Sequence, residues 1–227
     1  LGGSIPEFAH HPFLTDQDGK GFGKRLGSLS IENLKADGYE DVSIINYLIN
    51  IGSSEDIKPE TVKDNIIKNF DIKNISTSSA KFSEDVLKSL NADILKNYTF
   101  EQVSKRINFI DSDINLEKLW IFSHNNISFI KDINVWAEVI NKIFDTSENN
   151  IAEDFIETAV ENIPEEPFDY DSWDNWTKVI GEKSGLKGKN LFMPLRLILT
   201  GKDKGPELKN FLPLLNKQTL LRKFGKA

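Results

Sequence analysis

The sequence predicts a mainly α-helical protein with a short strand or hairpin near its N-terminus. Apolar residues recur every three or four positions through most of the chain, which is the spacing of a helix with one buried face. Segments that alternate between apolar and polar residues are scarce, and glycines and prolines separate the periodic segments. The chain has 227 residues, 39% of them hydrophobic, so it is long enough to bury a substantial core.

The first elements follow from turn residues and from a change of period. Asp18 and Gly19 form a turn signal because both tolerate positive φ, so we expect a strand or hairpin around residues 8–22. A short helix is then expected from Ile31, followed by a break at Gly38 and a longer helix that stops at Gly52.

Residues 54–162 are expected to form stacked amphipathic helices. Pro59 lies near the start of one of them, because proline suits the first helical turn. Ser83 has the hydroxyl that caps the next helix, and the helical pattern resumes at Thr99. It continues through the segments NLEKLWIFSHN, NVWAEVINKIF and IAEDFIETAVENI.

The last third of the chain begins with an acidic, proline-containing segment, PEEPFDYDSW, which suggests a linker. A helix ending at Gly185 follows it, with Trp173 and Trp176 on one side. Because these tryptophans recur at helical spacing, we expect them in the core and not on a base-stacking surface. Three short helices separated by glycine and proline complete the chain.

Charge is distributed unevenly along the chain. The formal net charge is −7, yet residues 178–227 hold twelve Lys and Arg against three Asp and Glu, a net charge of +9. The remainder therefore carries −16. A basic end on an acidic protein indicates a surface for a polyanion, because phosphate binding needs cations. A solvated helical surface is the alternative interpretation of the same charges.

Composition excludes several classes of protein. The sequence has no cysteine, which removes disulfides, thiol catalysis and cysteine-ligated zinc. Apolar runs stay below the roughly 18 residues of a membrane span, and a cationic-then-apolar leader is absent, so we expect a soluble protein of the cytoplasm with no membrane partner. His10, His11 and His124 are too few and too scattered for a metal site, so we expect no metal and a structural role for each.

The glycine-rich segment near the N-terminus has the composition of an anion-binding loop. Its glycines let the backbone approach an anion closely, and they carry the cations Lys20, Lys24 and Arg25. The spacing excludes a Walker phosphate loop, because Gly19 and Gly23 enclose three residues where that loop needs four. The dinucleotide fingerprint and the calcium-loop pattern fail as well.

The order of these residues resembles a known family. The stretch PEFAHHPFLTDQDGKGFGKRLG is similar to the signature-loop region of bacterial glutamyl-tRNA synthetases, which runs roughly P-x-F-A-H-x-P-L, then G-K-K-L-S-K-R-x-G. The end of the chain, NLFMPLRLILTGKDKGPEL, is close to the family's F-x-P-L-R-x-A-L-T-G and G-P-E-L. The other matching positions span nearly the whole chain: Pro6, Phe8, Ala9, His10, Pro12, Leu14, Gly19, Lys20, Lys24, Arg25, Gly27, Gly38, Tyr39, Asn46, Tyr47, Leu48, Gly52, Leu90 and Asn91.

The resemblance implies a class I aminoacyl-tRNA synthetase, which uses ATP and magnesium to attach glutamate to tRNA-Glu. Residues 1–53 would be the end of the catalytic domain with the signature loop and connecting helices. Residues 54–162 would form a first helical subdomain that contacts tRNA and the anticodon, and residues 163–227 a second anticodon-binding subdomain. The implied partners are tRNA, with glutamate and ATP for the whole protein, and no DNA.

The resemblance also implies residue roles in the signature loop. In the family this loop contacts the triphosphate of ATP. Lys24 holds the place of the lysine that stabilises charge moving onto pyrophosphate, with Lys20 and Arg25 as neighbouring cations. Gly21 and Gly23 stand where the family has a lysine and a serine, so one cation and one hydroxyl of the pattern are missing.

For the anticodon loop, the resemblance points to Arg196, Pro206 and Leu208, with Arg106 as a further candidate. An arginine offers a planar fork to the edge of an unstacked base, and apolar side chains pack against base faces. A surface ion pair is the alternative role for either arginine.

The nucleotide-binding half that would precede the signature loop is not in this sequence, so we expect the chain alone to be inactive. It would be the C-terminal part of a longer synthetase or a natural short paralogue. Two other functions stay open. The chain is either a helical interaction or scaffold module that has kept the ancestral fold, or part of a paralogue that charges tRNA-Gln with glutamate.

Overall fold

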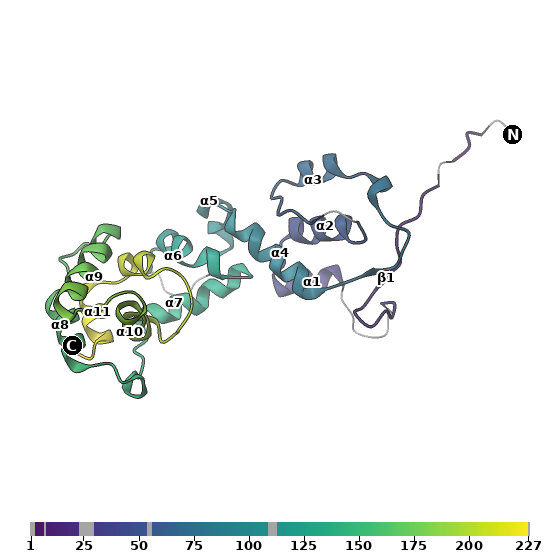
Figure 1. The fold of residues 1–227 in the computed structure, drawn as a ribbon. Coiled ribbons are helices and arrows are strands. Elements are labelled where there is room, and N and C mark those ends of the chain that lie inside the picture. Colours follow the sequence, from purple (N-terminus) through teal and green to yellow (C-terminus); the bar gives the residue numbers. More distant parts are fainter. Residues whose placement is uncertain (1–2, 7, 23–29, 54–55, 109–112, 227) are drawn as a thin grey trace. The chain divides into compact units, whose positions relative to one another are not determined.

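A computed structural model describes residues 3–6, 8–22, 30–53, 56–108 and 113–226. This part of the chain is mainly helical, as predicted, with a small two-stranded sheet (Figure 1). The chain divides into two compact units, residues 1–98 and 99–227. The boundaries expected after residues 53 and 162 both fall inside a unit, and the functional division into three parts stays a prediction.

The first unit opens with a short strand whose partner is distant in sequence. β1, Leu14–Thr15, runs parallel to β2, Ala80–Lys81, with Leu14 opposite Ala80. Beyond β1 the chain turns at Gly19, where φ is 84°, and Thr15 forms an antiparallel bridge with Gly21. The strand and turn near the N-terminus are therefore confirmed. The pairing with β2 is additional, since turn signals mark only local partners.

The helices of the first unit begin and end at the residues that capping chemistry favours. Gly38 closes the first helix in the left-handed conformation, at a φ of 104°. The Ser83 hydroxyl accepts a hydrogen bond from the Val86 amide at 3.4 Å and so caps the last helix. The unit contains α1 (Ile31–Asp37), α2 (Asp41–Asn50), α3 (Lys63–Asn69), the 3₁₀ turn η1 (Ile72–Asn74) and α4 (Glu84–Lys96).

Buried polar groups join α2 to α4 within the first unit. The fully buried Asn91 side chain accepts a hydrogen bond from the Glu40 amide at 2.8 Å, at the start of α2. The Tyr47 hydroxyl accepts another from the Ser83 amide at 2.7 Å. Because an unpaired buried polar group costs about 1–3 kcal/mol, these bonds fix how the two helices meet.

The second unit is built from short helices around an aromatic core. Trp173 and Trp176 are both buried, and the Trp176 indole donates to the Ala159 carbonyl at 2.9 Å. The expectation that these tryptophans belong to the core is confirmed. The unit contains α5 (Phe100–Val103), η2 (Ser104–Arg106), α6 (Leu116–Ser123), η3 (His124–Asn126), η4 (Ile130–Asp132), α7 (Ile133–Asn141), η5 (Ser147–Asn149), α8 (Glu153–Glu161), α9 (Tyr170–Ser184), α10 (Lys189–Thr200), η6 (Leu208–Asn210), η7 (Leu212–Leu214) and α11 (Lys217–Lys223).

Two segments of the second unit differ from the sequence-based expectation. The segment expected to be a linker packs inside the unit, because Phe168 is buried and the Glu166 carboxylate accepts a hydrogen bond from the Lys217 amide at 2.8 Å. The segment GPELKNFLPLL forms two 3₁₀ turns, η6 and η7, and not a continuous helix. Pro213 interrupts the helical hydrogen bonds there, since it has no amide proton.

A buried lysine ties the carboxyl ends of two helices to α11. The Lys223 ammonium donates to the carbonyls of Val139, Lys142 and Leu199 at 2.8, 2.8 and 2.9 Å. Its side chain is 5% exposed, and burial lowers the pKa of Lys223 to about 8. The three acceptors use all three donors of the ammonium, at helix ends whose carbonyls otherwise lack partners.

Candidate nucleic-acid interface

Arg196 lies on α10, a helix fixed by its buried apolar face and by its glycine ends. Leu195 and Leu199 on that face have no exposed surface. Gly188 precedes the first turn, and Gly201 ends the helix in the left-handed conformation with a φ of 64°. Arg196 is therefore carried on a rigid element and not on a loop.

The Arg196 guanidinium is partly buried and only partly bonded. Its Nη2 donates to the Pro206 carbonyl at 2.8 Å, while its buried Nη1 finds no acceptor among the described residues. Burial lowers the pKa of Arg196, but the group stays cationic because an arginine cannot be deprotonated in a protein. The guanidinium thus keeps one donor, Nη1, without an acceptor in the described part of the chain, and because Nη1 is buried an incoming acceptor reaches it only when the side chains that cover it move.

The segment after α10 brings Pro206 and Leu208 beside Arg196. Gly205 has a φ of 147°, and a Cβ there would lie 2.5 Å from the Trp136 ring, so only glycine fits at this position without a shift of the ring. Pro206 and Leu208 are buried. Three of the four predicted anticodon residues are therefore brought together. In this structure Pro206 contacts Arg196 through its carbonyl, and a role for the Pro206 and Leu208 side chains in packing against bases stays a prediction.

Arg106 lies in the same unit, exposed at the end of η2, directly before the buried Ile107. Its predicted role in anticodon binding stays a prediction.

Several cations of the basic end are paired with acids, which the charge count alone did not indicate. Lys209 lies 2.5 Å from Asp174, and Lys226 lies 3.0 Å from Glu153. Lys223 is buried, as described above. By contrast, Lys178 and Lys187 are exposed, and neither forms an ion pair with any residue that the structure describes. The cations available to a polyanion are thus a subset of the twelve.

The predicted ATP-contacting loop is described only at its start. Lys20 is exposed, and the turn that carries it is closed by the Asp16 carboxylate, which accepts from the Lys20 amide at 2.8 Å. Lys24 and Arg25 lie outside the described residues. A Cβ on Gly21 would meet the Phe13 ring at 2.6 Å, so the family's lysine at this place would require Phe13 to move. One lysine beside two aspartates does not by itself make a triphosphate site, and no catalytic step is assigned to it.

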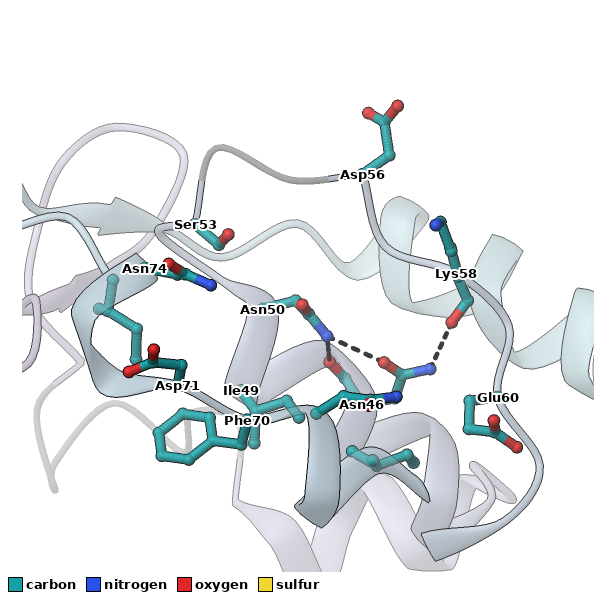
Figure 2. A pocket seen from close by; sticks show the side chains of 13 residues that line it. Asn46, Ile49, Asn50, Ser53, Asp56, Lys58, Glu60, Phe70, Asp71 and Asn74 are labelled. Atoms are coloured by element: carbon teal, nitrogen blue, oxygen red, sulfur yellow. Dashed lines mark hydrogen bonds between the residues drawn. The ribbon is translucent and has the colours of Figure 1, made fainter. Parts of the chain in front are cut away.

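The first unit holds a polar pocket of ≈ 280 Å³ that sequence reasoning missed, although asparagine recurs along the residues that form it. Its inner amides are bonded to one another: Asn50 Nδ2 donates to the carbonyl and the Oδ1 of Asn46, and Asn46 Nδ2 donates to the Lys58 carbonyl (Figure 2). Carboxylates at the rim, from Asp56, Glu60 and Asp71, oppose phosphate. This pocket is therefore not the place where a polyanion binds.

The described residues give little evidence for a histidine-based site, a metal site or a membrane-spanning helix. His124 stacks on Trp120, and its Nδ1 lies 3.0 Å from the Trp120 carbonyl. Residues 3–6, 8–22, 30–53, 56–108 and 113–226 contain no cluster of three His, Cys, Asp or Glu side chains suited to a metal ion. Within the same ranges, no helix combines the length and the apolar character that crossing a bilayer requires.

Known proteins resemble both the second unit and nearly the whole length of this chain. Residues 115–227 match the family model described as the anticodon binding domain. The chain is 34% identical over 226 residues to glutamate–tRNA ligase 2 of Hyphomonas neptunium, covering 98% of this chain and 50% of that protein. It is 36% identical over 218 residues to glutamate–tRNA ligase 2 of Brucella melitensis, covering 95% and 48%.

A solved structure shares the fold. The glutamate–tRNA synthetase of Elizabethkingia anophelis superposes with a TM-score of 0.75 at 23% identity, covering 99% of this chain and 51% of that one. The chain therefore spans about half the length of the relatives that it matches.

Proposed function

Because the chain is homologous to the C-terminal, anticodon-binding portion of glutamate–tRNA ligases, we propose that it binds the anticodon loop of a transfer RNA through α10 and residues 205–208. Single-stranded loops are recognised by hydrogen bonds to the edges of unstacked bases, which a guanidinium supplies. In this proposal Arg196 reads a base edge, and Pro206 and Leu208 form the adjoining wall.

The observation that carries the proposal is the half-satisfied Arg196 guanidinium. A buried donor without an acceptor costs about 1–3 kcal/mol, and an acceptor that reached Nη1 after its cover moved would remove this cost. The bond from Nη2 to the Pro206 carbonyl orients the fork before RNA arrives. A preoriented donor loses less conformational freedom on binding than a flexible one.

The proposal extends to the whole protein by homology. It would be a glutamate–tRNA ligase of the cytoplasm that uses ATP with magnesium and glutamate, and tRNA-Glu would be the first candidate substrate. A paralogue that charges tRNA-Gln with glutamate is the second candidate. Lys20, Lys24 and Arg25 would then serve the ATP site from the signature loop.

Binding of a labelled anticodon stem-loop of tRNA-Glu to the 227-residue chain tests the proposal. Arg196→Ala should weaken binding by about 10- to 150-fold, because hydrogen bonds to charged groups contribute about 1.5–3 kcal/mol. Arg196→Lys should lose most of this affinity as well, since an ammonium keeps the charge without the planar fork. Arg222→Ala, at an exposed cation on α11, is the control and should change affinity little.

Two results would contradict the proposal. One is equal affinity of the chain for this stem-loop and for an unrelated hairpin, and the other is an unchanged affinity in Arg196→Ala. Capture of a protein partner without RNA, together with either result, would favour the scaffold module. A stem-loop of tRNA-Gln in the same assay separates the two candidate substrates.

A further inference from the structure

We propose that the groove between α9 and the start of α10 binds one RNA base, stacked on Phe192, from the nucleotide next to the one that Arg196 contacts. This inference rests on the proposed function and adds a second contact to it. The groove has a volume of ≈ 360 Å³, and its walls come from both helices and from the loop that joins them: Asp174, Thr177, Lys178, Gly181, Glu182, Leu186, Lys187, Gly188, Leu191 and Phe192.

Phe192 is an exposed ring on a rigid support. It is 42% exposed, and its ring stacks on Trp173 with centroids 6.4 Å apart and planes 29° from parallel. Trp173 is itself 6% exposed and packs edge-on against the buried Trp176. A ring backed in this way keeps its orientation, and aromatic side chains that do so are the platforms on which unpaired bases stack.

The charges around Phe192 suit a nucleic-acid strand. Lys178 and Lys187 line the groove and are exposed, and Lys189 follows directly at the start of α10. Of the two acids in the groove, Asp174 is paired with Lys209 at 2.5 Å and Glu182 is exposed, so the three lysines Lys178, Lys187 and Lys209 outnumber the two acids. The first turn of α10 begins at Gly188, which has no side chain to cap its amides. Cations and a helix N-terminus without a side-chain cap, beside an aromatic ring, match a phosphate next to its base.

The groove adjoins the Arg196 site, which identifies the occupant as part of the same loop. Phe192 and Arg196 are four residues, about one helical turn, apart on α10, a rise of ~6 Å. Neighbouring nucleotides of an unstacked loop cover that span. Lys209, which pairs with Asp174 in the groove, also directly follows Leu208 of the proposed anticodon wall. One strand can therefore contact both places.

A second exposed phenylalanine provides a matched control. Phe70 is 45% exposed, close to the value for Phe192, but it lines the polar pocket of the first unit beside Glu60 and Asp71. The two rings offer similar apolar surface in opposite electrostatic surroundings. Only the ring beside the lysines should bind a base.

The experiment measures the affinity of the same anticodon stem-loop by fluorescence anisotropy. Phe192→Ala should weaken binding by about 5- to 150-fold, the range for losing one base stacked on an aromatic ring. Phe192→Tyr should keep the affinity, whereas Phe192→Leu should behave like the alanine variant because it lacks a π face. Phe70→Ala should bind like the wild type. Circular dichroism melting confirms that each variant is folded.

Stem-loops with a single abasic position identify the stacked base. Removing the right base should weaken wild-type binding and leave Phe192→Ala unaffected, while removing any other base should weaken both proteins alike. If the wild type binds and Arg196→Ala does not, but Phe192→Ala and Phe192→Leu bind normally, this inference is wrong and the proposed function stands. If the wild type shows no preference for the stem-loop, both are wrong.

Discussion

Lys223→Met is the substitution whose consequence the structure defines most fully. The buried ammonium of Lys223 donates to three carbonyls, two of them from residues of α7 and α10, and lies 5.3 and 5.6 Å from the ring centres of Phe144 and Phe211. Methionine is flexible, apolar and of similar length, so we expect it to keep most of the packing and to lose the charge. The change therefore removes three hydrogen bonds with little loss of packing. It leaves the carbonyls buried without their donor.

The expected loss follows from two opposing contributions. Hydrogen bonds to a charged group contribute about 1.5–3 kcal/mol each, and there are three of them. The burial that lowers the pKa of Lys223 from 10.5 to about 8 offsets about 3 kcal/mol of that sum. We therefore expect Lys223→Met to lower the free energy of unfolding of the second unit by about 1.5–6 kcal/mol.

Urea unfolding followed by tryptophan fluorescence measures this unit alone, because Trp120, Trp136, Trp173 and Trp176 are the four tryptophans of the chain and all lie after residue 98. A pH near 6.5 keeps Lys223 charged. Lys209→Met, which removes an exposed ion pair, should leave the midpoint nearly unchanged. A Lys223→Met protein as stable as the wild type, or more stable, would show that desolvation of the charge outweighs its three hydrogen bonds.

Two further predictions concern a glycine and a tyrosine. Gly205→Ala should destabilise the second unit by at least about 2 kcal/mol and weaken stem-loop binding, because φ is 147° and the new Cβ meets Trp136. As a control in the same unfolding assay, Gly185→Ala should cost about 1 kcal/mol, because Gly185 has a φ of 70° but lies in open space. Burial and the neighbouring Glu84 raise the pKa of Tyr39 to about 12 in the folded chain, whereas the pKa in the unfolded chain is near 10. The unfolded chain therefore loses this proton first as the pH rises, so the stability of the folded chain falls between about pH 10 and 12. Tyr39→Phe should reduce that fall in thermal melts across this range, and an identical fall in both proteins would contradict the shift.

The parts of the fold that depend on neighbours in sequence were predictable. The cap at Ser83 and the helix ends at Gly38 and Gly185 follow from local hydrogen bonds and from positive φ, which the residue types themselves indicate. The buried tryptophans follow from helical spacing. The motif around Arg196 marks it as a candidate, and its role in anticodon binding stays a prediction.

The parts of the fold and of the candidate site that depend on residues distant in sequence were not predictable from the local sequence pattern. Leu14 pairs with Ala80 across 66 positions of sequence, and nothing near either residue specifies the other. In the sequence Lys223 is one of twelve cations near the end of the chain, and only its burial against three carbonyls separates it from a solvated lysine. Likewise, Phe192 has the helical spacing of a core residue, and its exposure depends on how α9 and α10 pack.

Photocrosslinking tests the central claim, that α10 and residues 205–208 bind the anticodon loop, most directly. A stem-loop carrying 4-thiouridine at single anticodon-loop positions would be irradiated with the wild-type chain and the crosslinked peptides identified by mass spectrometry. We expect crosslinks within residues 189–208, which unlabelled stem-loop should compete and Arg196→Ala should reduce. Crosslinks confined to the residues that line the polar pocket of the first unit, between Asn46 and Ile75, would contradict that binding site.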